Sequence, residues 1–248
     1  MEAVLFDKDG TLSHSEPMLQ ALGIERIAHC LQLIRRVHPR KRTRNLETLL
    51  RRAYGLSEAG VDPAGALAVA ARDHNLVATA TALAQEGLGW PEAHAIAEEA
   101  FLRSEGRGEG DDPLPVPPPT DGLGGLLQAL RGAGVRCGVI SNDGEAGIRS
   151  FLRRHDLNDH FAALWSADHR PRKPDPAAVH GLCRVLGVPP RRCALVGDAN
   201  SDLHMARLAG VAVVLGYRAG WQRPVPLDAS FPHVDHWREL AVVARCGE

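Results

Sequence analysis

Short, continuous apolar runs stand at the N-terminus and in the second half of the chain. Residues 3–6 are all apolar and lead directly into a polar turn. Such a run is typical of a strand buried on both faces of a parallel sheet. Further runs of the same type predict four more strands, at residues 135–140, 162–165, 194–196 and 211–215.

Segments in which apolar residues recur at helical spacing separate these runs. They predict helices at residues 123–131, 144–154, 176–186 and 201–209. Strands that alternate with helices at this spacing indicate βαβ units, and therefore a parallel sheet with helices on both faces. The simplest arrangement places the first strand, residues 3–6, in the same sheet as the later ones.

Residues 15–104 follow a different pattern, because Ala, Leu, Arg and Glu dominate and runs of β-branched residues are absent. Apolar residues at helical spacing predict four helices there, at residues 15–37, 42–54, 62–86 and 91–104. Residues 106–119 are rich in Gly and Pro, which predicts a linker rather than a helix interior or a central strand.

These patterns predict an α/β fold with an insertion. The chain has 248 residues, enough for one large domain with a sizeable insertion. We expect a Rossmann-like parallel sheet core formed by residues 1–13 and 113–248. An all-helical domain, residues 14–112, is inserted after the first strand.

Overall composition limits the partners and the location of the protein. The chain contains 29 basic and 30 acidic residues, which gives no general attraction to nucleic acid or to an anionic membrane. Its longest uncharged apolar stretch, residues 208–217, is too short to cross a bilayer, and residues 3–6 are too short for the core of an export signal. Five cysteines without a Cys-x-x-Cys pair fit a reducing cytoplasm, which is the expected location.

Charge is distributed unevenly within the insertion. Residues 14–56 hold nine basic and three acidic residues, whereas residues 57–112 hold three basic and eleven acidic ones. No aromatic residue lies between Arg35 and Arg52, which argues against single-stranded nucleic acid as a ligand of this basic run. Two interpretations stay open: the basic helix faces pair with the acidic half, or they steer an anionic substrate.

Four polar clusters lie at or shortly after the ends of predicted strands. They are residues 7–11, 141–144, 172–176 and 197–202. In an open parallel sheet, ligands bind at the carboxyl ends of the strands. We therefore expect the four clusters to converge on one edge of the sheet.

The carboxylates of Asp7, Asp9 and Asp198 are candidate metal ligands. Strand periodicity allows Asp7 and Asp9 to project to one side of the strand end. Carboxylates that share a pocket repel one another unless a cation is present. A set of oxygen ligands suits Mg²⁺, and the four clusters contain neither His nor Cys, which argues against zinc. Metal-assisted chemistry on a phosphate group is the leading hypothesis.

Further groups in the clusters suit a bound phosphate. Ser141 offers a hydroxyl, Asn142 lies just before a predicted helix start that favours an anion, and Lys173 adds a positive charge. Asp7 is ionised at neutral pH and can attack phosphorus without a base to activate it. Asp9 can donate a proton to the departing alkoxide and then deprotonate the water that hydrolyses the aspartyl-phosphate.

Four short motifs resemble those of the haloacid dehalogenase superfamily and occur in the same order. They are Asp7-Lys8-Asp9-Gly10-Thr11-Leu12, Ser141-Asn142, Lys173-Pro174 and Gly197-Asp198-x-x-x-Asp202. The helical insertion directly after the first motif resembles the subfamily with a C1-type helical cap, which includes phosphoglycolate-phosphatase-like enzymes. The resemblance covers the chain outside the insertion.

This resemblance implies a phosphatase that hydrolyses a small phosphorylated metabolite. It implies that Asp7 is the nucleophile and Asp9 the general acid and base. It also implies Mg²⁺ held by the side chains of Asp7 and Asp198 and by the carbonyl of Asp9, with Asp202 behind these ligands or as an alternative to one of them. Three residues would hold the phosphoryl group: Ser141, Asn142 and Lys173.

Lys8 departs from the family pattern, which has an apolar or aromatic residue between the two aspartates. We expect its side chain to point away from the nucleophile and the chemistry to be retained. Two other functions stay open: a phosphoglucomutase-like enzyme that transfers the phosphoryl group to a sugar hydroxyl, and a non-catalytic binding protein. A dehalogenase is disfavoured because Asp9, a leaving-group acid, is present.

Overall fold

The computed structural model describes residues 1–40, 45–106 and 116–242. The chain divides into two compact units. The first, here called the core unit, contains Met1–Ser15 and Val116–Glu248. The second, here called the inserted unit, contains Glu16–Pro115. None of the helices in the described ranges has both the length and the apolar character needed to cross a membrane.

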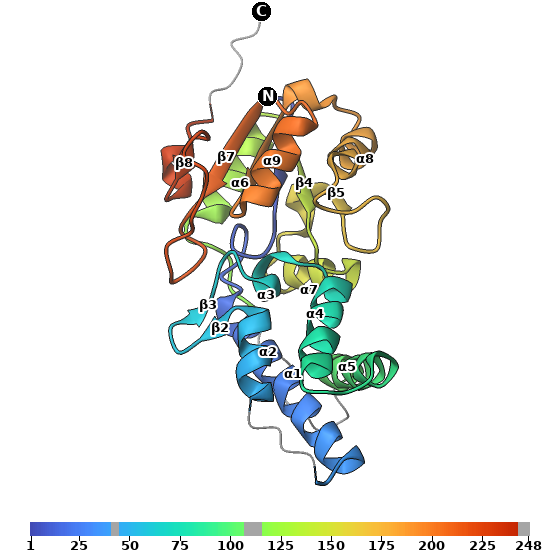
Figure 1. Cartoon of the computed structure of the whole chain (residues 1–248). Coiled ribbons are helices and arrows are strands. Elements are labelled where there is room, and N and C mark those ends of the chain that lie inside the picture. Colours follow the sequence, from blue (N-terminus) through green and yellow to red (C-terminus); the bar gives the residue numbers. More distant parts are fainter. Residues whose placement is uncertain (41–44, 107–115, 243–248) are drawn as a thin grey trace, which may run out of the picture. The chain divides into compact units, whose positions relative to one another are not determined.

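The core unit is built on a six-stranded sheet in which every neighbouring pair of strands is parallel (Figure 1). The strands lie in the order β5-β4-β1-β6-β7-β8. Their bounds are β1 Ala3–Phe6, β4 Arg136–Ile140, β5 Phe161–Trp165, β6 Cys193–Gly197, β7 Val213–Tyr217 and β8 His233–Val234. The predicted parallel α/β sheet is therefore confirmed. β8 was not predicted, because two residues are too few to show a periodicity.

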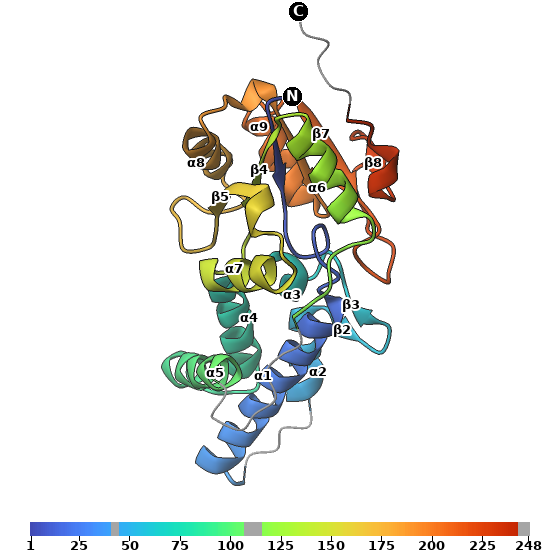
Figure 2. The same ribbon diagram turned by 180° about the vertical axis from the view of Figure 1, so that it is seen from behind.

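Helices cover both faces of this sheet. α6 and α7 pack on one face, and α8 and α9 pack on the other. Figure 1 shows α9 in front of the sheet, and Figure 2 shows α6 in front of it from the opposite side. The bounds are α6 Leu123–Gly132, α7 Glu145–Arg154, α8 Pro176–Leu186 and α9 Asn200–Leu208, with short 3-10 helices at Asn158–His160, Pro190–Arg192 and Trp237–Glu239.

The central strand β1 supplies side chains to both hydrophobic cores. Val4 and Phe6 pack with residues of α6 and α7, whereas Ala3 and Leu5 pack with residues of α8 and α9. All four are buried. A strand enclosed on both faces must be apolar at every position, which is why β1 stands out in the sequence as a continuous run.

The strand order reverses at β1. From β1 the chain continues to β4 and β5 on one side, and it then returns to β6 on the other side of β1. In open α/β sheets, ligands bind at such a switch point, outside the carboxyl ends of the strands. The residues that follow β1, β4 and β6 are therefore the ones best placed to form a site.

The inserted unit is mostly helical but contains a short hairpin. Its helices are α1 Glu16–Val37, α2 Leu46–Tyr54, α3 Ala66–Val69, α4 Arg72–Gln85 and α5 Trp90–Glu105. The antiparallel strands β2 Leu56–Ser57 and β3 Gly60–Val61 connect α2 to α3. The prediction of an all-helical insertion was wrong in this detail. Of the helix predicted at 42–54, residues 42–44 lie outside the described ranges.

The single helix predicted at residues 62–86 was also wrong, because the chain is extended at Ala70 and Ala71 between α3 and α4. The Asn75 side-chain amide donates hydrogen bonds to the carbonyl oxygens of Ala66 and Ala70, both at 3.0 Å. The Ala66 carbonyl also accepts the backbone N–H of Ala70 at 2.9 Å, so the Asn75 amide adds a second donor there and bonds the carbonyl of Ala70, the residue that ends α3. A local apolar pattern does not reveal such a side-chain contact.

Buried charge in the inserted unit has close partners. The guanidinium of Arg26 lies 3.8 Å from the centroid of the Phe101 ring. It also pairs with the Glu105 carboxylate at 3.2 Å, and Glu105 in turn pairs with Arg72 at 2.8 Å. Arg26 belongs to the basic half of the insertion and Glu105 to the acidic half, so pairing between the two halves occurs at this position.

Candidate active site

Asp7 is fixed at the point where β1 ends. Its backbone N–H donates to the carbonyl oxygen of Val196 at 2.9 Å, which continues the pairing of β1 with β6 by one residue. The side chain is buried. The carboxylate is therefore held at the switch point of the sheet by the backbone that precedes it.

Three buried carboxylates meet at this edge of the sheet. Asp7 follows β1, Asp198 follows β6 and Asp202 lies in the first turn of α9. One oxygen atom from each of the three lies within 4.8 Å of the others. Segments nearly two hundred residues apart in the sequence are thus brought into one acidic cluster.

Burial and mutual repulsion disfavour ionisation of this cluster. Burial raises the pKa of Asp7 to about 6; the charge of Lys173 opposes this shift, and those of Asp202 and Asp9 add to it. The pKa of Asp198 is raised well above its ordinary value, first by burial and then by the charges of Asp7 and Asp202. Three carboxylates and one lysine leave an excess of negative charge in a buried place.

Lys173 is the cation within the acidic cluster. Its Nζ donates to Asp7 Oδ1 at 2.5 Å, lies 2.6 Å from Asp202 Oδ1 and reaches the carbonyl oxygen of Ile140 at 3.4 Å. Burial alone would lower its pKa, but the carboxylates of Asp202 and Asp7 outweigh burial and raise it. Lys173 is therefore a protonated link between the end of β1, the end of β4 and the start of α9.

The cluster fits a magnesium ion. Its donors are carboxylate oxygens, the ligand type that Mg²⁺ prefers. Three carboxylates against the single charge of Lys173 leave the cluster short of positive charge. A divalent cation would supply the missing positive charge. The carboxylate of Asp9, which the sequence grouped with these acids, is not part of the cluster.

Asp198 is held by two donors from different loops. Thr11 Oγ1 donates to Asp198 Oδ1 at 2.9 Å, and Trp221 Nε1 donates to Asp198 Oδ2 at 2.5 Å. Gly10, at φ +81°, lets Trp221 approach, because a Cβ at this position would lie 2.1 Å from Trp221 Nε1. Sequence reasoning missed Trp221, since it lies after β7 in a loop without a recognisable motif.

The loop after β4 contains two of the three predicted phosphate-binding residues, Ser141 and Asn142. The backbone N–H of Ser141 donates to the carbonyl oxygen of Trp165, and Ser141 Oγ accepts from the backbone N–H of Asp143 at 3.1 Å. Asn142 lies between them, three residues before α7 begins at Glu145. Because β4 neighbours β1 and Lys173 contacts Ile140, this loop begins beside Asp7.

Asp9 is engaged by a different set of groups. Its Oδ1 accepts from Lys8 Nζ and from Ser15 Oγ, each at 2.5 Å. Lys8 Nζ also lies 3.0 Å from Asp143 Oδ2. Burial would lower the pKa of Lys8, but the charges of Asp9 and Asp143 outweigh it and raise that pKa. The Lys8 side chain thus contacts Asp9 and Asp143 rather than the acidic cluster. Its pairing with Asp143 was not predicted, because no local pattern indicates it.

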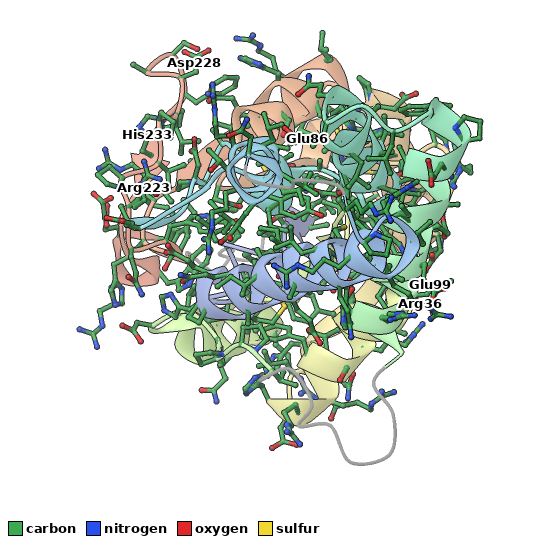
Figure 3. The ribbon with its side chains drawn as sticks, turned by 60° about the horizontal axis from the view of Figure 1, so that its bottom comes forward. Arg36, Glu86, Glu99, Arg223, Asp228 and His233 are labelled. Atoms are coloured by element: carbon green, nitrogen blue, oxygen red, sulfur yellow. The ribbon has the colours of Figure 1, made fainter. Side chains whose placement is uncertain are left out.

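The histidines near these loops have ordinary structural contacts. His14 Nδ1 lies 3.4 Å from the carbonyl oxygen of Gly220. His233 Nε2 lies 3.1 Å from the carbonyl oxygen of Asp228; both residues are labelled in Figure 3, on the segment after β7. Neither histidine belongs to the acidic cluster found in the described ranges.

Known proteins resemble this chain in sequence and in fold. The profile of the haloacid dehalogenase-like hydrolase family matches residues 1–210. A phosphoglycolate phosphatase of Pseudomonas putida is 30% identical, over 96% of this chain and 77% of its own length. Another, from Thiobacillus denitrificans, is 38% identical, but the match covers 46% of this chain and about half, 52%, of that protein.

A solved structure supports the fold independently of sequence. The crystal structure of a predicted phosphoglycolate phosphatase from Haemophilus somnus superposes with a TM-score of 0.65, at 19% identity, and the match covers 96% of each chain. At this identity the likeness concerns the fold alone. The family match over residues 1–210, together with the relative from Pseudomonas putida, shows that this chain belongs to the haloacid dehalogenase-like hydrolases.

Proposed function

We propose that this protein is a magnesium-dependent phosphatase that hydrolyses a small phosphate monoester through an aspartyl-phosphate on Asp7. The observation that carries the proposal is the buried cluster of Asp7, Asp198 and Asp202, with Lys173 in contact with Asp7. The family match and the names of the relatives, which are phosphoglycolate phosphatases, support the same class of reaction.

Asp7 is the nucleophile in this proposal. One carboxylate oxygen attacks phosphorus, the bond between phosphorus and the ester oxygen breaks, and the phosphoryl group is transferred to Asp7. Lys173 lies against Asp7 and offers its ammonium group to the phosphoryl oxygens. Ser141 and Asn142, at the end of the neighbouring strand β4, hold the same oxygens with a hydroxyl and an amide.

Asp9 transfers the proton that each half of the reaction requires. In the first half it gives a proton to the leaving alkoxide, which departs as an alcohol. In the second half the same carboxylate takes a proton from the water that attacks the aspartyl-phosphate. Phosphate is then released and Asp7 is restored.

Magnesium would be held by the carboxylates of Asp7 and Asp198 and by the carbonyl of Asp9. The ion supplies positive charge that offsets the repulsion between the attacking carboxylate and the phosphate. Asp202 pairs with Lys173 through Oδ1, at 2.6 Å. In this proposal it holds Lys173 in place and does not bind the ion directly. Thr11 and Trp221 orient Asp198, because each donates a hydrogen bond to one of its carboxylate oxygens.

The inserted unit, with boundaries near residues 14 and 112, serves as a cap in this proposal. A cap over the site excludes bulk water and selects the leaving group. The substrate is a small phosphorylated metabolite of the cytoplasm, and phosphoglycolate is the first compound to test because it appears in the names of the relatives.

The proposal is tested by measuring phosphate release from a panel of phosphorylated metabolites, with Mg²⁺ and with EDTA. We expect release in Mg²⁺ alone, and a loss of at least about a thousandfold in Asp7→Asn. Asp159→Asn, which changes an exposed aspartate of the core unit, is the matched control and should behave like the wild type. Magnesium-dependent activity that persists in folded Asp7→Asn would reject the mechanism, and an isomeric sugar phosphate as product would indicate a mutase.

A further inference from the structure

Within the described ranges, Lys8 and Ser15 donate hydrogen bonds to the Asp9 carboxylate, and both reach the same oxygen. Lys8 Nζ and Ser15 Oγ donate to Oδ1, each at 2.5 Å, and Oδ2 receives neither of these bonds. The Asp9 side chain is 17% exposed, whereas that of Lys8 is only 3% exposed. One oxygen of Asp9 is thus held from the protein side, and the other is left for exchange with a ligand or water.

The Lys8 ammonium is itself held in place. It lies 3.0 Å from Asp143 Oδ2, and Asp143 Oδ1 accepts from the backbone N–H of Gly144 at 2.7 Å, just before α7. Its Nζ also lies 6.0 Å from the centroid of the Phe151 ring of α7. The ammonium therefore connects the loop after β1 to the start of α7.

Ser15 is fixed in a similar way from the other side. Its hydroxyl lies 2.7 Å from that of Ser13, which donates to the backbone carbonyl oxygen of Lys8 at 3.1 Å. Ser13 and Ser15 are both buried. Asp9 Oδ1 therefore accepts from two donors that are themselves held in place, the charged Lys8 and the neutral Ser15.

We propose that Lys8, anchored by Asp143, and Ser15 are positioning residues that fix Asp9 Oδ1 and so make Oδ2 the atom that transfers the proton. This inference rests on the proposed function, because it assigns an orientation to the acid and base of that reaction. In the first half the Oδ2–H bond breaks as the proton passes to the ester oxygen. The carboxylate that remains is stabilised by the Lys8 ammonium until it takes a proton from water.

Lys8 can be replaced without removing the backbone bonds of its loop. Its carbonyl oxygen accepts from the backbone N–H groups of Leu12 and Ser13, at 2.9 and 3.0 Å, whatever the side chain. Lys8→Met removes the ammonium and keeps an unbranched chain, but it takes away the cation beside the Asp143 carboxylate, which keeps its hydrogen bond from the backbone N–H of Gly144. The double variant Lys8→Met/Asp143→Asn also removes the unpaired Asp143 charge. A loss of activity in the double variant can therefore be attributed to the positioning of Asp9 rather than to a destabilised fold.

The test compares two substrates whose leaving groups differ in their need for a proton. Phosphoglycolate, or the alkyl phosphate that the metabolite panel identifies, releases a strongly basic alkoxide, whereas p-nitrophenyl phosphate releases a stable anion. In both Lys8 variants, we expect kcat/KM for the alkyl ester to fall at least about tenfold more than that for p-nitrophenyl phosphate. Ser15→Ala should show the same selectivity at about threefold, because a neutral donor contributes less than a charged one.

Arg26→Met is the matched control, since Arg26 is another buried cation that is paired with a carboxylate, but in the inserted unit. It should lower thermal stability without changing the ratio of the two kcat/KM values. An equal loss on both substrates in Lys8→Met/Asp143→Asn, or no loss, would overturn the positioning role while leaving the proposed function intact. If the wild type hydrolyses no phosphate ester at all, the proposed function itself is rejected, and the inference with it.

Discussion

The two units of this protein bury charged groups in opposite ways. In the inserted unit, the cation of Arg26 lies on the face of Phe101 and pairs with Glu105. At the carboxyl edge of the core sheet, three carboxylates are buried together and one lysine, Lys173, pairs with two of them, Asp7 and Asp202. The first arrangement is close to neutral, whereas the second carries an excess of negative charge.

This difference separates a structural arrangement from a functional one. A buried charge is expensive unless it is paired, so an unbalanced cluster destabilises the fold. An excess that persists is therefore expected where a ligand supplies the opposite charge. We therefore expect that removing a carboxylate at the sheet edge reduces activity but also reduces the repulsion between buried charges. A change at Arg26 should reduce stability alone.

Asp198→Asn should cause the largest loss of activity among the changes considered below. It removes one of the two carboxylates proposed to hold Mg²⁺ but can keep hydrogen bonds to Thr11 and Trp221. We expect phosphatase activity at fixed Mg²⁺ to fall at least about a hundredfold. Isothermal titration calorimetry with Mg²⁺ should show no saturable binding, and unchanged binding would contradict the metal site.

The same variant should be more stable than the wild type when no metal is present. Removing one of three mutually repelling buried carboxylates should raise the free energy of unfolding in EDTA by about 1 kcal/mol. Denaturant unfolding in EDTA measures this difference. A variant that is destabilised in EDTA would show that the cluster is balanced without a cation.

The pH dependence of stability should reverse when magnesium is added. The pKa of Asp7 is raised from 3.8 to about 6, so between these values the folded, metal-free protein binds a proton that the unfolded chain has lost. This contribution to stability is complete below pH 3.8 and disappears as the pH rises through about 6.

In EDTA, the melting temperature should therefore rise as the pH falls from about 8 to about 5, whereas in saturating Mg²⁺ it should fall, because protons compete with the ion. Asp228 does not affect this comparison, because its pKa is lowered from 3.8 to about 2. Its contribution to stability is lost only as the pH falls below 3.8, outside the range compared. Parallel slopes in EDTA and in Mg²⁺ would show that the ion does not bind these carboxylates.

The sequence predicted the parts of this comparison that depend on local pattern. β1 and α8 were predicted with the bounds that the structure shows, because a strand buried on both faces is a continuous apolar run and α8 begins with Pro176. The carboxylates of Asp7 and Asp198 were expected together because strand ends of a parallel sheet meet at one edge.

The parts that were missed depend on contacts between distant residues. Trp221 reaches Asp198 from a loop after β7, and Lys8 reaches Asp143 across the sheet edge. The break between α3 and α4 is spanned by the Asn75 side chain, which donates to carbonyl groups up to nine residues earlier. None of these contacts leaves a periodic signal in the chain.

Trp221→Phe should have a smaller effect than Asp198→Asn, because it removes only a hydrogen bond to the proposed ligand. The indole N–H donates to Asp198 Oδ2 at 2.5 Å, and phenylalanine keeps a ring against Gly10 without this donor. We expect the Mg²⁺ dissociation constant, measured by calorimetry, to rise about tenfold. Trp90→Phe, in the inserted unit, is the control and should leave this dissociation constant unchanged. If Trp221→Phe has the same dissociation constant as the wild type, the indole only fills space.

Arg26→Met should have the smallest effect on activity and thereby sharpens the contrast between the two units. The variant keeps apolar contact with Phe101 but loses the charge that pairs with Glu105. Glu105 is partly exposed and keeps Arg72 as a partner, so the free energy of unfolding should fall by only about 1–2 kcal/mol. Activity per folded molecule should change by less than about twofold, because no proposed ligand or acid is touched. A large loss of activity with unchanged stability would mean that the balanced charge in the inserted unit also serves the reaction.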